Sequence, residues 1–159
     1  MKQFTDKWGK LLEYYRDQPI DYLEIGLYKG ESLPLWYNYF GTNCNIHGID
    51  LDLSLISIDS RFNFKFYEMN ALDQSKFNLY FKDKQFDVIV DDANPFQHAS
   101  VFDLYSKLLK PGGTYIIETY KCSAQYYKDF TYIKNQNKWK IEMMNSNLSF
   151  GKAFNIKHQ

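Results

Sequence analysis

Residues 22–32 have the sequence Tyr22-Leu23-Glu24-Ile25-Gly26-Leu27-Tyr28-Lys29-Gly30-Glu31-Ser32. An apolar run ends in an acid and a glycine, and a second glycine and a serine come just before a helical pattern. This order predicts a strand, a tight loop and a helix that Ser32 caps. Glycine permits a sharp turn or the close approach of a ligand, and a helix N-terminus presents free N–H groups to it.

A second acid follows this loop. Ile46-His47-Gly48-Ile49-Asp50 predicts another strand that ends in a carboxylate, about 20 residues downstream. A carboxylate there can accept hydrogen bonds from both hydroxyls of a ribose. The loop and the acid together predict a site for a nucleoside-containing cofactor. Taken singly, each glycine could be a plain turn, and each acid could be a helix cap or a solvated side chain.

The composition limits the class of protein. With 159 residues, we expect one domain over residues 1–159. Lys plus Arg and Asp plus Glu both number 19, without a charge run, so neither a nucleic-acid partner nor a membrane partner is predicted. No signal peptide and no apolar run long enough to span a bilayer is present, which predicts a cytoplasmic protein. Cys44 and Cys122 fit reduced thiols rather than a disulfide framework or a zinc site.

The remaining hydrophobic patterns complete the predicted fold. Helices are predicted over residues 4–16, from Ser32 to Gly41, from Asn94-Pro95 to Leu109, and more weakly over 126–133. Strands are predicted at residues 22–25, 45–49, 62–66, 86–91, 114–117, 139–143 and 150–156. The order of these elements predicts an α/β fold, namely a doubly wound, mostly parallel seven-stranded sheet with a C-terminal antiparallel hairpin.

Several of these segments resemble one family. Residues 24–33, with Trp36, Tyr39-Phe40 and Gly48-Ile49-Asp50-Leu51-Asp52, resemble the class I S-adenosylmethionine-dependent methyltransferases, and are most similar to the macrocin-type sugar O-methyltransferases. The resemblance continues through residues 86–92 and 109–118. It implies a Rossmann-like methyltransferase fold, S-adenosylmethionine as the cofactor, and O-methylation of a small hydroxylated, sugar-like acceptor. The Glu-x-Gly-x-x-x-Gly spacing and the terminal hairpin disfavour a nicotinamide-binding domain.

The resemblance also implies the cofactor residues. The loop with Glu24, Gly26 and Gly30 would lie under the methionine part, Asp50 would hold the ribose, and Asp91 would lie under the sulfonium. Leu51 would lie beside the adenine, and Asn70-Ala71 would meet its edge. The expected set is Glu24, Gly26, Leu27, Gly30, Ser32, Asp50, Leu51, Asn70, Ala71 and Asp91.

Catalysis and metal binding are implied less directly. Asp91 and Glu118 match two magnesium positions of the macrocin-type enzymes, so Mg²⁺ is a second expected cofactor. Thr119 stands at the third metal position, and Pro95 stands where these enzymes have a catalytic histidine. His98 lies one helical turn further on and could replace it, or it could be an ordinary surface histidine. The candidate bases are Asp91, Asp92 and His98.

The short connections leave little of the chain to enclose an acceptor. A homodimer is therefore predicted, with Tyr126, Tyr127 and Phe130 as candidate contact residues, although these rings could instead pack on the sheet. The alternative function is a non-methylating S-adenosylmethionine-binding protein or the cofactor-binding subunit of a larger assembly.

Overall fold

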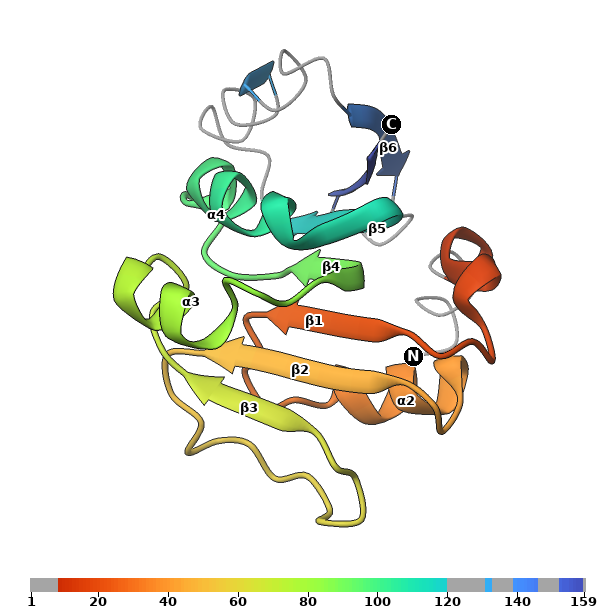
Figure 1. Ribbon diagram of the computed structural model, residues 1–159, viewed down its shortest axis with the longest axis vertical. Helices are drawn as coiled ribbons and strands as arrows, with labels where there is room; N and C mark the ends of the chain where they lie inside the picture. Colours follow the sequence, from red (N-terminus) through yellow and green to blue (C-terminus); the bar gives the residue numbers. More distant parts are fainter. Residues whose placement is uncertain (1–8, 120–130, 133–138, 146–151, 159) are drawn as a thin grey trace.

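A computed structural model describes residues 9–119, 131–132, 139–145 and 152–158 (Figure 1). Its strands form one sheet in the order β3-β2-β1-β4-β5-β7-β6. Their bounds are β1 Asp21–Ile25, β2 Asn45–Asp50, β3 Lys65–Glu68, β4 Phe86–Asp91, β5 Leu109–Thr119, β6 Trp139–Asn145 and β7 Lys152–His158. Strands β1 to β5 are parallel, and β7 runs antiparallel to both β5 and β6. The predicted doubly wound α/β class is confirmed.

Helices cover both faces of this sheet (Figure 1). They are α2 Ser32–Phe40, α3 Gln74–Tyr80 and α4 His98–Tyr105, with short 3₁₀ turns η1 Glu13–Tyr15 and η2 Ser106–Leu108. One core cluster, on the face of α3 and α4, contains Ile25, Ile89 and Ile117. The other, on the face of α2, contains Tyr22, Val90 and Ile116. Neighbouring strand residues thus alternate between two separate cores. In the described part of the chain, no helix is long and apolar enough to cross a membrane.

Two predicted elements begin three or four residues later than expected. The strand predicted over residues 62–66 begins only at Lys65. Phe62 and Phe64 do not join the sheet, because their rings stack on each other and pack edge-on or tilted against Tyr37 of α2. The helix predicted from Asn94 begins at His98. Asn94 forms a separate turn in which its side-chain oxygen accepts a hydrogen bond from the Phe96 amide.

Other local features went unpredicted. Helix α3 was not predicted, although its first turn has a sequence signal. Asp73 caps it by accepting hydrogen bonds from the amides of Ser75 and Lys76. The predicted helix stop at residues 110–113 lies inside β5, where the pairing with β4 shifts register. The helix predicted at residues 4–16 is described only from residue 9, and the segment 126–133 lies outside the described residues except for 131–132.

Candidate functional site

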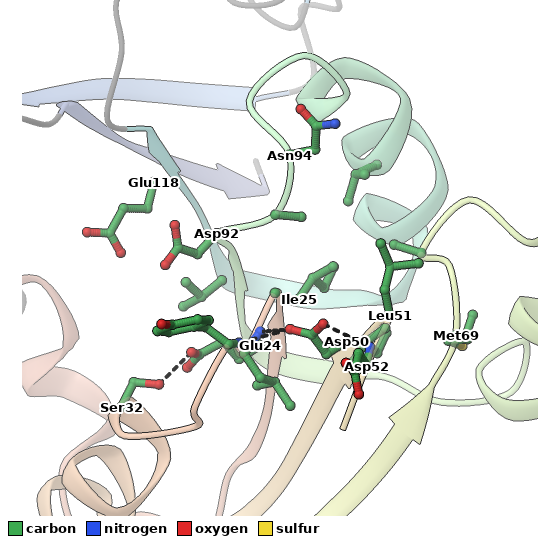
Figure 2. Close-up of a pocket in the computed structure, with 18 of the residues that line it drawn as sticks. Glu24, Ile25, Ser32, Asp50, Leu51, Asp52, Met69, Asp92, Asn94 and Glu118 are labelled. Atoms are coloured by element: carbon green, nitrogen blue, oxygen red, sulfur yellow. Dashed lines mark hydrogen bonds between the residues drawn. The ribbon is translucent and has the colours of Figure 1, made fainter. Parts of the chain in front are cut away.

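A cavity of about 610 Å³ lies at the carboxyl ends of β1, β2 and β4 (Figure 2). The chain order of the sheet reverses at β1, which lies between β2 and β4. Ligands of open α/β sheets bind at this kind of switch point. The cavity wall includes the loop after β1, the ends of β2, β3 and β4, the start of α2, and Glu118 of β5.

The loop after β1 requires glycine at position 26. Gly26 has φ +90°, and its amide donates a 2.8 Å hydrogen bond to the carbonyl of Ile49. A Cβ atom at this position would lie 2.5 Å from the carbonyl oxygen of Asp92. The predicted tight loop is therefore confirmed, and its cause is the close crossing of two backbones.

Gly30 has a different role from the predicted one. It has φ +72°, and a Cβ atom there would meet the side chains of Ile58 and Ile56 at 3.0 and 3.2 Å. Gly30 is not part of the cavity wall. Its lack of a side chain lets residues 56–58 pack beneath the loop.

Asp50, at the end of β2, joins the two loops that flank the cavity. Its Oδ2 atom accepts hydrogen bonds from the amides of Leu27 and Tyr28, at 2.7 and 2.9 Å. Its Oδ1 atom accepts a weaker one from the Asp52 amide at 3.2 Å. Asp52 also contributes to the cavity wall, and it was not predicted. The alternation Asp50-Leu51-Asp52 was the signal that could have identified it.

Glu24 is the buried acid of the site, with 4% of its surface exposed. Its Oε2 atom accepts a 2.7 Å hydrogen bond from the Tyr22 hydroxyl. Its Oε1 atom accepts a 2.5 Å hydrogen bond from the Ser32 hydroxyl, which Figure 2 shows. Desolvation raises the pKa of Glu24 to about 7, against the lowering effect of these two bonds. Ser32 was predicted to cap α2. That prediction is wrong, because the cap position is Glu31 and the Ser32 hydroxyl is engaged by Glu24.

Glu24, Asp92 and Glu118 lie on one side of the cavity (Figure 2). Burial, followed by the charge of Glu24, raises the pKa of Glu118 to about 7. Burial, followed by the charges of Glu24, Glu118 and Asp92, raises the pKa of the Tyr22 phenol. This side of the cavity is therefore rich in carboxylates.

Asp91 lies on the opposite face of the sheet. It pairs in register with Ile25 and Ile117, which both belong to the core on the α3 and α4 face. Its side chain is 0% exposed, and its Oδ2 atom lies 3.0 Å from Nδ1 of His98, which is 2% exposed. Neither residue contributes to the cavity wall. The predicted position of Asp91 under the sulfonium is therefore wrong, as is the alternative of a surface histidine.

The predicted metal site at Asp91 and Glu118 is not formed, because only Glu118 lies in the cavity wall. Asp91 and Glu118 project from opposite faces, since Glu118 follows Ile117 by one residue on β5. Within the ranges that the structure describes, no group of three or more His, Cys, Asp or Glu residues is arranged to hold a metal ion. The residues present do not fit the expected Mg²⁺ ion, and we assign no step to a metal.

The structure brings most of the other predicted residues together. Those that line the cavity are Glu24, Gly26, Leu27, Ser32, Asp50, Leu51, Asn70, Ala71, Asp92 and Glu118. Among the lining residues that sequence reasoning missed are Met69, Ala93 and Asn94, of which Asn94 was predicted only as a helix start.

The doubly wound sheet, the glycine turn and the acid at the end of β2 together have the arrangement of a Rossmann-like domain. Residues 19–156 match the family model described as a methyltransferase domain. Because this match spans most of the chain, the chain belongs to the methyltransferase domain family, and the prediction of a methyltransferase is confirmed. No curated protein sequence matches the chain.

Solved structures share this fold at low identity. Aeropyrum pernix fibrillarin with natively bound S-adenosyl-L-methionine is 16% identical, with a TM-score of 0.72 over 87% of this chain and 66% of that one. An rRNA-methylase candidate from Clostridium thermocellum is 9% identical, with a TM-score of 0.71 over 97% and 96%. The MycE methyltransferase of the mycinamycin biosynthetic pathway, in complex with Mg and SAH, is 19% identical, with a TM-score of 0.68 over 98% and 46%. The Rossmann-like methyltransferase fold is thereby confirmed, and this chain spans only part of fibrillarin and MycE.

Proposed function

We propose that this methyltransferase binds S-adenosylmethionine in the cavity at the ends of β1, β2 and β4. The observation that carries the proposal is the link from Asp50 to the amides of Leu27 and Tyr28, which places an acid beside the glycine turn at the switch point. The similar fibrillarin and MycE structures were solved with S-adenosyl-L-methionine and SAH, respectively.

The two ends of the cofactor have distinct places in this proposal. Asp50 accepts hydrogen bonds from the ribose hydroxyls, with Asp52 as a second acceptor beside it. Leu51, which is 70% exposed at the cavity wall, covers one face of the adenine, and Asn70 and Ala71 meet its edge. Apolar surface beside a few placed polar groups is the usual composition of a cofactor pocket. The methionine part lies against Gly26, Leu27, Ser32 and Glu24.

The proposed reaction is methyl transfer to a hydroxyl of a small, sugar-like acceptor. The acceptor oxygen forms a bond to the methyl carbon as the sulfur–carbon bond breaks, and the hydroxyl proton passes to the Asp92 carboxylate. Asp92 is the candidate base that lines the cavity, unlike Asp91 and His98. The protein otherwise aligns the two reactants and excludes water. The similarity to MycE supports a small acceptor, whereas the Clostridium thermocellum relative makes RNA the acceptor to test against it.

A non-methylating role within a larger assembly is the second candidate. It is favoured by one observation, namely that this chain covers only 46% of MycE. We also propose a homodimer in which the second copy covers the acceptor side of the cavity. Sedimentation at micromolar concentration, with and without cofactor, tests the dimer, and a monomer mass in both conditions would exclude it.

Calorimetry with S-adenosylmethionine, followed by turnover assays, tests the main proposal. The acceptor panel should contain hydroxylated sugars and a structured RNA, each with and without EDTA. We expect saturable cofactor binding and methylation of a sugar hydroxyl that EDTA does not change. An absence of cofactor binding would overturn the proposal. Binding without turnover of any acceptor would favour the non-methylating role, and methylation of the RNA alone would replace the sugar-like acceptor.

A further inference from the structure

We propose that Tyr22 is a positioning residue, whose buried hydroxyl acts with Ser32 to hold the Glu24 carboxylate against the cavity, where it receives the ammonium group of the bound cofactor. The inference rests on the proposed function, because it assigns a partner to Glu24 within the same cofactor site. Tyr22 itself does not line the cavity and would act only through Glu24.

The packing around Tyr22 determines the position of its hydroxyl, which donates a hydrogen bond to Glu24. The residue is 0% exposed, and its ring packs against Trp36 and Phe40 of α2, with centroid distances of 6.1 and 5.7 Å. Its hydroxyl donates to Glu24 Oε2 at 2.7 Å. Burial raises the pKa of Tyr22 well above its ordinary value, so the phenol keeps the proton that it donates. The packed ring therefore delivers the hydroxyl to one place.

The two hydroxyls use only part of the capacity of Glu24. Tyr22 donates to one carboxylate oxygen and Ser32 to the other, and each carboxylate oxygen can accept more than one hydrogen bond. The remaining lone pairs of the Glu24 carboxylate can accept hydrogen bonds from a ligand, because Glu24 is part of the cavity wall. A ligand donor can thus reach a carboxylate that is already fixed from behind.

The charges that face Glu24 explain why this donor should be cationic. Tyr22 on β1 and Ser32 on α2 are neutral, whereas Asp92 after β4 and Glu118 on β5 are acidic. Among the described residues, Glu24 has these hydrogen bonds but no ion pair. A buried carboxylate without a counterion is costly, and a ligand ammonium supplies the missing charge.

Proton release follows from this arrangement. Because the pKa of Glu24 is raised to about 7, the free protein retains a proton on Glu24 to a higher pH than an ordinary glutamate would. An ammonium group favours the ionised carboxylate, so cofactor binding expels this proton. Tyr22→Phe removes a hydrogen bond that lowers the pKa of Glu24, so the variant should hold the proton more fully before binding and release more of it on binding.

The experiment is calorimetric titration of S-adenosylhomocysteine at pH 7 in two buffers of different ionisation enthalpy. S-adenosylhomocysteine retains the ammonium group and lacks the sulfonium charge. We expect proton release by the wild-type protein, and in Tyr22→Phe about threefold to thirtyfold weaker binding with increased proton release. Tyr115→Phe is the matched control, because Tyr115 is also fully buried in the sheet and its hydroxyl has no partner in the described part of the chain.

Each outcome discriminates. Tyr22→Phe with wild-type affinity and wild-type proton release would overturn the inference. Weaker binding with unchanged proton release would also overturn it, because a purely structural effect loosens the site without moving the titration of Glu24. Ser32→Ala, like Tyr22→Phe, should weaken the binding of S-adenosylhomocysteine and increase proton release. This variant serves as the test if Tyr22→Phe does not fold. Failure of the wild-type protein to bind S-adenosylhomocysteine would instead overturn the proposed function.

Discussion

The Nδ1 atom of His98 lies 3.0 Å from the Oδ2 atom of Asp91, and both side chains are sealed in the core behind the cavity. Asp92 follows Asp91 in the chain and lines the cavity on the other face of the sheet. Two neighbouring acids at the end of β4 therefore serve two different environments. The first belongs to the packing of α4 on the sheet, and the second belongs to the proposed reaction.

Amide substitutions should separate these two acids. Asp91→Asn weakens the buried hydrogen-bond contact with His98 and should lower the free energy of unfolding by about 1–3 kcal/mol, measured by urea denaturation. Asp92→Asn should change the free energy of unfolding little but reduce the methyl-transfer rate by about 10²–10⁴-fold. A stable Asp91→Asn protein with abolished turnover and normal cofactor affinity would return the catalytic role to Asp91.

Two glycines with positive φ permit a second test. Gly26→Ala meets both strain and a clash with the Asp92 carbonyl, whereas Gly112→Ala, at φ +77°, has no atom within 4 Å of the added Cβ. We expect Gly112→Ala to cost about 1 kcal/mol and Gly26→Ala to cost about 3 kcal/mol or more. Thermal unfolding of both variants measures the difference. Equal costs would show that the backbone crossing at Gly26 is not tight.

Asp50→Ala tests the ribose site. The variant loses the proposed contacts to the ribose and the bonds from the amides of Leu27 and Tyr28. Each charge-assisted bond to the cofactor contributes about 1.5–3 kcal/mol, so affinity for S-adenosylmethionine should fall by at least about tenfold. Asp83→Ala removes a carboxylate whose side chain is 86% exposed and serves as the control. Unchanged affinity in Asp50→Ala, measured by calorimetry, would exclude the assignment.

The raised pKa of Glu118 predicts how stability depends on pH. The carboxyl titrates near 4.5 when unfolded and at about 7 when folded, so the folded state retains the proton longer. Stability therefore falls as pH rises from about 4.5 to about 7 and is lower by a constant amount above that window. Glu118→Gln, which cannot ionise, should be more stable than the wild-type protein by about 1–3 kcal/mol at pH 8 and should lose this advantage at pH 4.5.

Urea denaturation at the two pH values measures the effect of Glu118→Gln. Glu13→Gln provides the control, because Glu13 is an exposed acid. A stabilisation of Glu118→Gln that is equal at both pH values would indicate better packing rather than the removal of a partly buried charge.

The local part of the site was predictable from sequence. The strand before Gly26, the turn itself and the strand before Asp50 each depend on residues that are close together in the chain, and the structure places both residues in one cavity wall. The family resemblance extended this prediction to Leu51, Asn70 and Ala71. Sequence spacing was sufficient because the carboxyl ends of adjacent parallel strands meet at one edge of the sheet.

The partners of the acids were not predictable in the same way. Which face Asp91 or Glu118 occupies depends on strand register, and a shift of one residue would exchange the two faces. Ser32 matched a helix-cap pattern, yet its hydroxyl donates a hydrogen bond to Glu24 instead of capping α2. The packing of α2 on β1 determines this contact. The short helix α3 has Phe77 as its one buried residue, which is too little for a periodic pattern.

Residues 51–64 connect β2 to β3 without a helix or strand, yet Leu51, Asp52 and Leu55 of this connection form part of the cavity wall. The methionine end of the proposed cofactor rests on a strand and a helix, whereas the nucleoside end rests largely on irregular backbone. Segments with few backbone hydrogen bonds open at little free-energy cost. We therefore expect amide hydrogen exchange to be fast in this connection and to slow there most when cofactor binds, so that ligand release begins at the nucleoside end.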